Sequence, residues 1–433
     1  MMGRDLRALV SAPRRHVGLL LSLGLALGVG PATPLASAAI QVLPVKAEPL
    51  AAPVPAAGTQ APAEVEGGVK AKPPAAFSLP EAPYPEPGYL AYESGVKRLG
   101  MAGPWLRILR VGRYRANLDG FMNWKVWYQL APARNGGFGL AQPVVQDGPG
   151  FDALHPVRMV WHGTNSFVPS GDIVVGSNRE VFVPFYYPPL DDAGQYYNPL
   201  HAYTYTNSGV LIGRLSPDGS AMHWTLGDVV ALPPDQSTRG ANETAIAELD
   251  APGRFLMVIR GSNEVGGKTR PQPGCVWKAI STDYCRTWST PSPFAYSDSG
   301  RFFAPSACSA LLRNSRNHRL YWFGNLSATN PVGNWPRYPL VVGEVDEGRC
   351  ALIKETVVTI ATRDPRRDSD RVQFSNFSVE EDEATGSFIL KLDRVDDGRP
   401  AAVPAESTHL EFEIRTSCPA PDPLAARPPG SLP

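Results

Sequence analysis

The sequence has no excess of either charge and is poor in cysteine and histidine. Its 433 residues include 41 Lys and Arg against 41 Asp and Glu, so the formal net charge at pH 7 is zero. Proteins that bind nucleic acid usually present a basic surface, so this balance gives no support for a nucleic-acid partner. The chain has five scattered cysteines, which argues against a disulfide scaffold. No two of them form a Cys-x-x-Cys pair and there are only seven histidines, which argues against a structural zinc site. We therefore expect no metal and no cofactor.

Sustained helical periodicity is also missing after the first 38 residues. The 45 prolines and 41 glycines interrupt the chain often, which disfavours helix bundles and coiled coils. Hydrophobic residues nevertheless make up 43% of the chain, enough to form a core, so wholesale disorder is excluded.

Residues 1–38 resemble an export signal. Arg4 and Arg7 belong to a basic start, Val17–Gly30 is apolar, and Ala36-Ser37-Ala38 supplies a small-residue cleavage pattern. The apolar run is short for a membrane span. We expect an exported protein, periplasmic or extracellular, that contacts a membrane only if this leader stays uncleaved.

Alanine and proline dominate residues 39–85, and residues 417–433 are similarly rich in proline. Such segments bury too little surface to offset their ordering entropy, so both are predicted to be disordered, the first as a linker. Residues 86–416 between them are predicted to form one domain, expected to be a monomer.

Short β-branched or aromatic segments fill this domain, such as Trp105–Arg110, Phe255–Arg260 and Leu340–Val345. Turn residues such as Asn135-Gly136-Gly137 and Pro217-Asp218-Gly219 separate them. Many short strands with frequent turns predict an all-β sandwich, barrel or propeller.

A weak internal repeat favours the propeller. A polar turn closed by tryptophan occurs twice, in Ser281–Trp288 (STDYCRTW) and Ser216–Trp224 (SPDGSAMHW). A degenerate copy of the same turn is found in Leu130–Phe138 (LAPARNGGF). A repeated turn between the last two strands of a sheet is typical of propeller blades. At about 50 to 55 residues per blade, the domain would hold six blades of four antiparallel strands.

These turns resemble the Asp-box of the sialidase (neuraminidase) superfamily, whose pattern is Ser-x-Asp-x-Gly-x-Thr-Trp. Ser281, Asp283, Thr287 and Trp288 match it, and Cys285 replaces the glycine. Segments 242–260, 303–312, 337–345 and 374–390 follow in the order of that superfamily's later blades. The resemblance covers roughly residues 105–395.

The resemblance implies an exported glycoside hydrolase that cleaves a terminal, anionic sugar from a glycan. Asp119 falls where the acid/base would lie, and Glu243 where the partner of a tyrosine nucleophile would lie. Arg260 and Arg337 match the second and third arginines that hold a substrate carboxylate, while the first arginine is not placed.

Two further cations, Arg113 and Arg115, are close in sequence to Asp119 and are candidates for holding an anionic sugar. The alternative for these positions is that they are turn, edge and rim residues of an ordinary propeller.

The sequence departs from the family pattern at the nucleophile. Phe374-Ser375-Asn376 stands where a tyrosine is expected, and phenylalanine has no hydroxyl to form a glycosyl intermediate. Other tyrosines are possible substitutes: Tyr186, Tyr187, Tyr196, Tyr197, Tyr203, Tyr205 and Tyr338. The alternatives are a non-catalytic carbohydrate-binding propeller that has lost its nucleophile and an exported interaction scaffold.

Overall fold

The computed structural model describes residues 39–49, 90–112, 124–396, 398 and 408–416. Within these ranges the chain forms strands, turns and one short 3-10 helix, η1 (Lys354–Thr356), and contains no α-helix. Accordingly, these ranges contain no helix that is long and apolar enough to cross a membrane.

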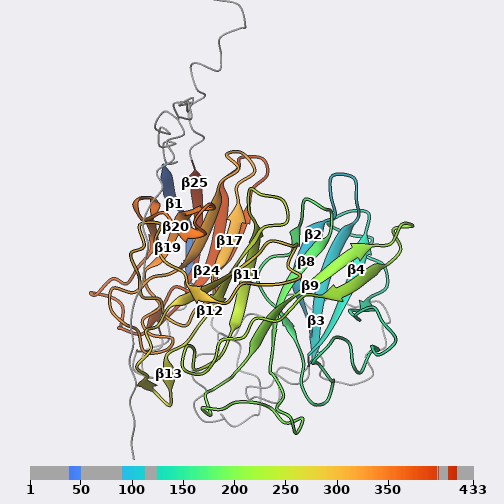
Figure 1. Ribbon diagram of the computed structural model, residues 1–433. Helices are drawn as coiled ribbons and strands as arrows, with labels where there is room; N and C mark the ends of the chain where they lie inside the picture. Colours follow the sequence, from blue (N-terminus) through green and yellow to red (C-terminus); the bar gives the residue numbers. More distant parts are fainter. Residues whose placement is uncertain (1–38, 50–89, 113–123, 397, 399–407, 417–433) are drawn as a thin grey trace, which may run out of the picture. The chain divides into compact units, whose positions relative to one another are not determined.

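The strands form five antiparallel sheets in chain order (Figure 1). The first holds β2 (Leu90–Arg98), β3 (Trp105–Gly112), β4 (Lys125–Ala131) and β5 (Gln142–Pro143). The second holds β6 (Val168–Pro169), β7 (Val174–Val175), β8 (Val181–Tyr187), β9 (Asn207–Leu215) and β10 (Met222–Leu226). The third holds β11 (Asn242–Glu248), β12 (Phe255–Arg260), β15 (Val276–Ser281) and β16 (Ser292–Pro293).

The fourth sheet holds β17 (Ala310–Arg313), β18 (Leu320–Asn325), β19 (Leu340–Asp346), β20 (Ala351–Leu352) and β21 (Val358–Ala361). The fifth holds β22 (Val372–Gln373), β23 (Ser378–Glu381), β24 (Phe388–Asp396), β25 (Thr408–Thr416) and β1 (Ile40–Pro49). A small hairpin, β13 (Glu264–Val265) and β14 (Lys268–Thr269), extends from the third sheet's β12–β15 connection.

Successive sheets pack face to face, which makes the fold an all-β propeller. Alternate residues of a strand point to opposite faces, and β12 shows the consequence. Phe255, Met257 and Ile259 belong to the core shared with the second sheet, whereas Leu256 and Val258 belong to the core shared with the fourth. Because both faces are buried, the strand is apolar throughout rather than alternating.

The repeated polar turns lie between the third and fourth strands of their sheets. In the turn between β15 and β16, the Asp283 carboxylate accepts hydrogen bonds from Ser281 Oγ at 2.8 Å and from the Thr287 N–H at 2.9 Å. Cys285 has a φ of 61°, the left-handed conformation that glycine adopts most easily.

The described residues contain five blades rather than the six expected. Their first strands begin at residues 90, 168, 242, 310 and 372, so the repeat is 62 to 78 residues long and not about 50 to 55. Long connections, such as the one between β5 and β6, account for the difference.

The expected linker over 39–85 is wrong for its first residues, because Ile40–Pro49 is β1. This strand pairs with β25 from Ile40↔Thr416 to Pro49↔Thr408 and so forms the outer edge of the last blade (Figure 1). Ile40 and Val42 also pack against the core between the fourth and fifth sheets. Strand pairing and these apolar contacts together order a segment that its composition alone would leave mobile.

We predict that Val42→Asp destabilises the domain by about 2 kcal/mol, because it places a carboxylate against an apolar core. Gln41→Asp is the matched control, since Gln41 is exposed on the same strand, and should change the free energy of unfolding by less than about 0.5 kcal/mol. Urea unfolding of both variants tests this, and equal stabilities would show that β1 is not part of the folded unit.

Candidate functional site

Glu243 lies at an irregularity near the start of β11. The β11–β12 register shifts between Asn242 and Ala245, and Glu243 has a φ of 37°, which is rare for a residue with a side chain. Its N–H donates to Asn242 Oδ1 at 2.9 Å. A bulge of this kind redirects a side chain out of the regular strand pattern, and here it brings the carboxylate to Arg260.

Arg260 ends β12 directly opposite Asn242. Arg260 is 8% exposed, and its guanidinium donates three hydrogen bonds from its three nitrogens. The acceptors are Glu243 Oε2 at 2.5 Å, Ser306 Oγ at 2.9 Å and Asn334 Oδ1 at 3.2 Å. Arg260 is therefore held in one orientation by a carboxylate and two neutral oxygens.

Arg337 precedes β19 and is 3% exposed. It donates to Gln373 Oε1 at 2.8 Å and to the Ser306 carbonyl at 3.0 Å, while its buried Nε has no hydrogen-bond partner among the described residues. Ser306 thus links Arg337 to Arg260, one through its carbonyl and the other through its hydroxyl.

Arg239, just before β11, completes the group that we call the arginine cluster (Arg239, Arg260 and Arg337). It donates twice to Thr204 Oγ1, at 3.0 and 2.6 Å, and lies over the ring of Tyr203. Burial and repulsion from Arg260 lower the pKa of Arg239 to about 10 and that of Arg337 to about 10. Both guanidiniums remain charged at neutral pH.

Glu243 is the carboxylate that these cations share. Burial raises its pKa, but attraction to Arg260, Arg239 and Arg337 outweighs burial, and the resulting pKa is below the usual value. Glu243 is consequently ionised at neutral pH. Three cations against one carboxylate leave a positive excess in a largely buried setting, which favours the binding of an additional anion.

Two further groups respond to the charge of Glu243. Burial and then the Glu243 carboxylate raise the pKa of the Tyr186 hydroxyl, on β8, and of the Cys308 thiol. Tyr186 is 8% exposed. The Cys308 thiol is half-buried and lies 3.9 Å from Asn376 Oδ1.

The structure brings together three of the residues singled out from the sequence: Glu243, Arg260 and Arg337. Asp119, Arg113 and Arg115 lie outside the described residues. Of the two predicted catalytic carboxylates, Glu243 therefore lies in the described site, and Asp119 lies outside the described residues.

Phe374 is next to the site only through its backbone. Its N–H donates to the Arg337 carbonyl at 3.0 Å, whereas its side chain is 4% exposed and belongs to the core between the fourth and fifth sheets. Gln373, one residue earlier, is the residue of this segment whose side chain contacts Arg337.

Three of the seven tyrosines singled out from the sequence have hydroxyl groups with other partners. The hydroxyls of Tyr187, Tyr196 and Tyr205 donate to Met159 Sδ, the Tyr205 carbonyl and the Leu232 carbonyl, respectively. Their contacts are those of blade packing. Tyr186 also packs, with Trp124 and Val168, but it differs from them in that, beyond burial, the charge of Glu243 raises its pKa.

Sequence reasoning missed Arg239, Ser306 and Gln373. Gly240, which follows Arg239, has a φ of 65°, and a Cβ there would lie 2.2 Å from the Thr206 carbonyl, but this constraint is visible only in the structure. An arginine before such a glycine and four residues before Glu243 marks a tightly packed connection. Ser306 and Gln373 have no signal in the sequence either, since their roles depend on pairing between distant segments.

Metal binding has no support in this part of the protein. The described residues contain no group of three or more His, Cys, Asp or Glu side chains that could hold a metal ion. Cys275, Cys285, Cys308 and Cys350 are free thiols.

Comparison with known proteins finds no matching family model and no matching curated protein. Among solved structures, the chain is similar to a mutant NanB sialidase from Streptococcus pneumoniae, with 16% identity over 67% of this chain and 35% of that chain and a TM-score of 0.41. Trypanosoma rangeli sialidase is 13% identical over 75% of this chain and 45% of that chain, with a TM-score of 0.45. The Hadza microbial sialidase Hz136 is 10% identical over 76% of this chain and 52% of that chain, with a TM-score of 0.47.

The chain spans between 35% and 52% of the length of these three proteins. At these identities and TM-scores the similarities carry no argument about activity.

We predict that the arginine cluster directs anionic reagents to Cys308. The quantity compared is the rate at which iodoacetate alkylates Cys308 divided by the rate for neutral iodoacetamide. This ratio should be at least about fivefold higher in the wild type than in Arg260→Gln, because the cluster concentrates the anion. The preference should shrink in 1 M salt, where the Debye length is about 3 Å. Peptide mass spectrometry measures both rates, and an identical rate ratio in the two proteins would contradict an anion site beside Cys308.

Proposed function

We propose that this protein is an exported, sialidase-like glycoside hydrolase that removes a terminal anionic sugar from glycans outside the cytoplasm. The observation on which the proposal rests is the arginine cluster around the ionised Glu243. One strand end and two connections contribute its guanidiniums, and neutral oxygens rather than carboxylates anchor most of their nitrogens. The Asp-box-like turns add the support of the sequence resemblance.

In this proposal, the arginine cluster holds the carboxylate of the sugar. A guanidinium presents paired N–H donors that match two carboxylate oxygens. Arg260 already donates to Glu243, so the sugar would be held beside that carboxylate. Binding would also relieve the repulsion among the three arginines.

Glu243 acts as the base in the reaction that we propose. It takes the proton from the Tyr186 hydroxyl while the Tyr186 oxygen attacks the anomeric carbon and the bond to the leaving-group oxygen breaks. Asp119 gives its proton to that oxygen. Water then displaces the tyrosine from the glycosyl intermediate, with Asp119 as the base, and the proton returns from Glu243 to Tyr186.

Tyr186 is proposed as the nucleophile because it is the tyrosine whose pKa responds to Glu243 and to the charges of Arg260 and Arg239. Its pKa is raised, so it would need a base to become nucleophilic, and Glu243 is ionised. Tyrosine nucleophiles are an exception among glycosidases and are found in sialidases.

A second candidate is a non-catalytic carbohydrate-binding propeller. The burial of Phe374 in the core favours it, because the position at which the family has its nucleophile offers no hydroxyl to the site. In that case the arginine cluster would bind an anionic glycan without cleaving it.

The first test is turnover of a sialoside and a panel of anionic oligosaccharides by the purified protein. Glu243→Gln should lower kcat by about 10²–10⁴-fold, the usual contribution of a general base. The same variant should bind the anionic product about fivefold more tightly, since removing a like charge is worth about 1 kcal/mol.

The control is Glu355→Gln, an exposed glutamate of η1, which should leave both quantities unchanged. If the wild type turns over no substrate while Glu243→Gln still binds the product more tightly than the wild type does, the protein is the non-catalytic carbohydrate-binding propeller.

Tyr186→Phe removes one oxygen and leaves the ring in place. If Tyr186 is the nucleophile, this variant should lose at least about 10³-fold in kcat with little change in KM. Tyr187→Phe, the next residue, should keep wild-type turnover because its hydroxyl contacts Met159 instead. Full activity of Tyr186→Phe in a working enzyme would assign the nucleophile to another residue.

A further inference from the structure

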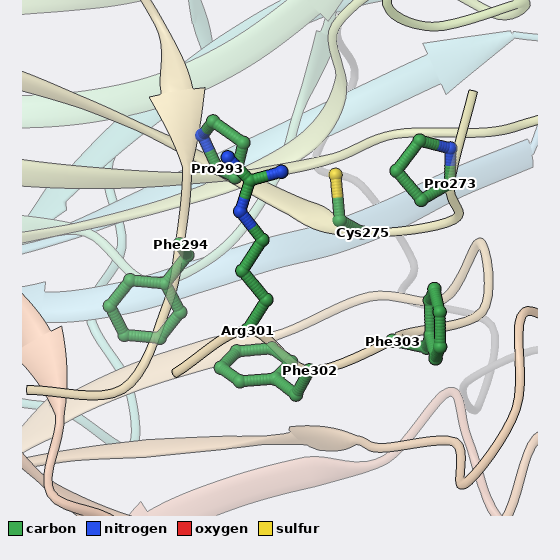
Figure 2. Close-up of a pocket in the computed structure, with 7 residues that line it drawn as sticks. All are labelled: Pro273, Cys275, Pro293, Phe294, Arg301, Phe302 and Phe303. Carbon is green, nitrogen blue, oxygen red and sulfur yellow. The ribbon is translucent and has the colours of Figure 1, made fainter. Parts of the chain in front are cut away.

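A pocket separate from the arginine cluster lies beside the third sheet, where the chain leaves β16 (Ser292–Pro293) toward the fourth sheet. Its volume is about 250 Å³, slightly below the range of about 300–1,000 Å³ typical of sites for drug-sized ligands. Three short segments line it, within residues 273–275, 293–294 and 301–303 (Figure 2). They contribute three phenylalanines, two prolines, Cys275 and Arg301, and we call the space the aromatic pocket.

The walls of the aromatic pocket are held by backbone pairing. The Phe294 N–H donates to the Val276 carbonyl at 2.8 Å, and the Ala304 N–H donates to the Gly274 carbonyl at 3.0 Å. Phe294 meets Phe302 edge to face, with ring centroids 6.0 Å apart. The pocket therefore exists before any ligand binds, which lowers the cost of binding.

Most of the lining is apolar, but the apolar surface is not fully covered. Phe294 is 1% exposed, whereas Phe303 is 37% exposed although it is a large hydrophobic residue. A flat apolar group placed in the pocket would bury part of Phe303 and would meet aromatic rings, which prefer stacked or edge-to-face contacts.

Arg301 sets the electrostatics of the pocket. It is exposed, and within the described ranges it makes neither a side-chain hydrogen bond nor an ion pair. None of the seven lining residues is acidic. In Figure 2 the guanidinium of Arg301 lies beside Pro293, and the Cys275 thiol points toward the same part of the pocket.

The lining argues against a sugar as the occupant. Apart from Arg301, the only polar side chain is the Cys275 thiol, a weak donor and acceptor. Several sugar hydroxyls would lose water without gaining partners, which costs free energy for each. An apolar group with a single anionic substituent avoids this cost, because Arg301 can pair with the anion.

We propose that the aromatic pocket is a second ligand site, which binds a small aromatic carboxylate with its ring among the phenylalanines and its carboxylate on Arg301. The site is distinct from the arginine cluster, although the two are neighbours in the fold. Cys275 directly precedes Val276, which pairs with Arg260, and Ser306 follows Phe303 by three residues.

Benzoate and benzamide are the probes, because they share a ring and differ in charge. Ligand-detected NMR titration of the intact protein should give a dissociation constant for benzoate of about 1 mM or lower and at least about tenfold weaker binding of benzamide. Arg301→Gln should abolish this preference while keeping the binding of benzamide. Arg366→Gln, at an exposed arginine between β21 and β22, is the matched control and should behave as wild type.

Binding of benzoate by the arginine cluster is the competing explanation, and Arg260→Gln separates the two. The preference for benzoate should persist in Arg260→Gln and disappear in Arg301→Gln; the reverse pattern would overturn the proposal. Phe303→Ala should weaken both probes at least about threefold. Equal binding of the two probes by the wild type, or binding of neither, would also overturn it.

Discussion

Burial of both faces of a sheet is the constraint on which the rest of this structure depends. The second, third and fourth sheets lie between two apolar cores each, so their central strands are mostly apolar. The charged residues of the candidate site lie at strand ends and in connections, as Glu243 and Arg260 show at the ends of β11 and β12. The candidate site forms there because several sheets bring such ends together, and the closing strand β1 keeps the last of these sheets paired along its outer edge.

The charge balance of the site follows from how its arginines are anchored. Ser306, Thr204, Gln373 and Asn334 supply neutral oxygens to the arginine cluster, and these oxygens orient the guanidiniums without cancelling their charge. Glu243 is ionised because those cations outweigh the effect of its burial. An anion that enters would replace lost hydration with preorganised donors, which is the arrangement expected of a site that stabilises negative charge.

The aromatic pocket and the arginine cluster differ in the chemistry they offer. The cluster has several cations and a carboxylate in polar surroundings, whereas the pocket has apolar walls and one unpaired arginine. Both depend on the segment around residues 301–308, which places Phe303 in the pocket and Ser306 between two arginines. Movement of this segment would therefore affect both sites at once.

The sequence by itself determined the strand-rich class and the positions of the repeated polar turns, and it placed Glu243 and Arg260 at the ends of two consecutive short segments, because these features depend on local pattern. Tertiary structure decided the number of blades, the folding of Ile40–Pro49 into the last sheet and the place of Phe374 in the core. It also decided that Arg239, Ser306 and Gln373 would join the site. Such features depend on contacts between residues far apart in the chain, where the free energy of packing exceeds the preference of any local segment.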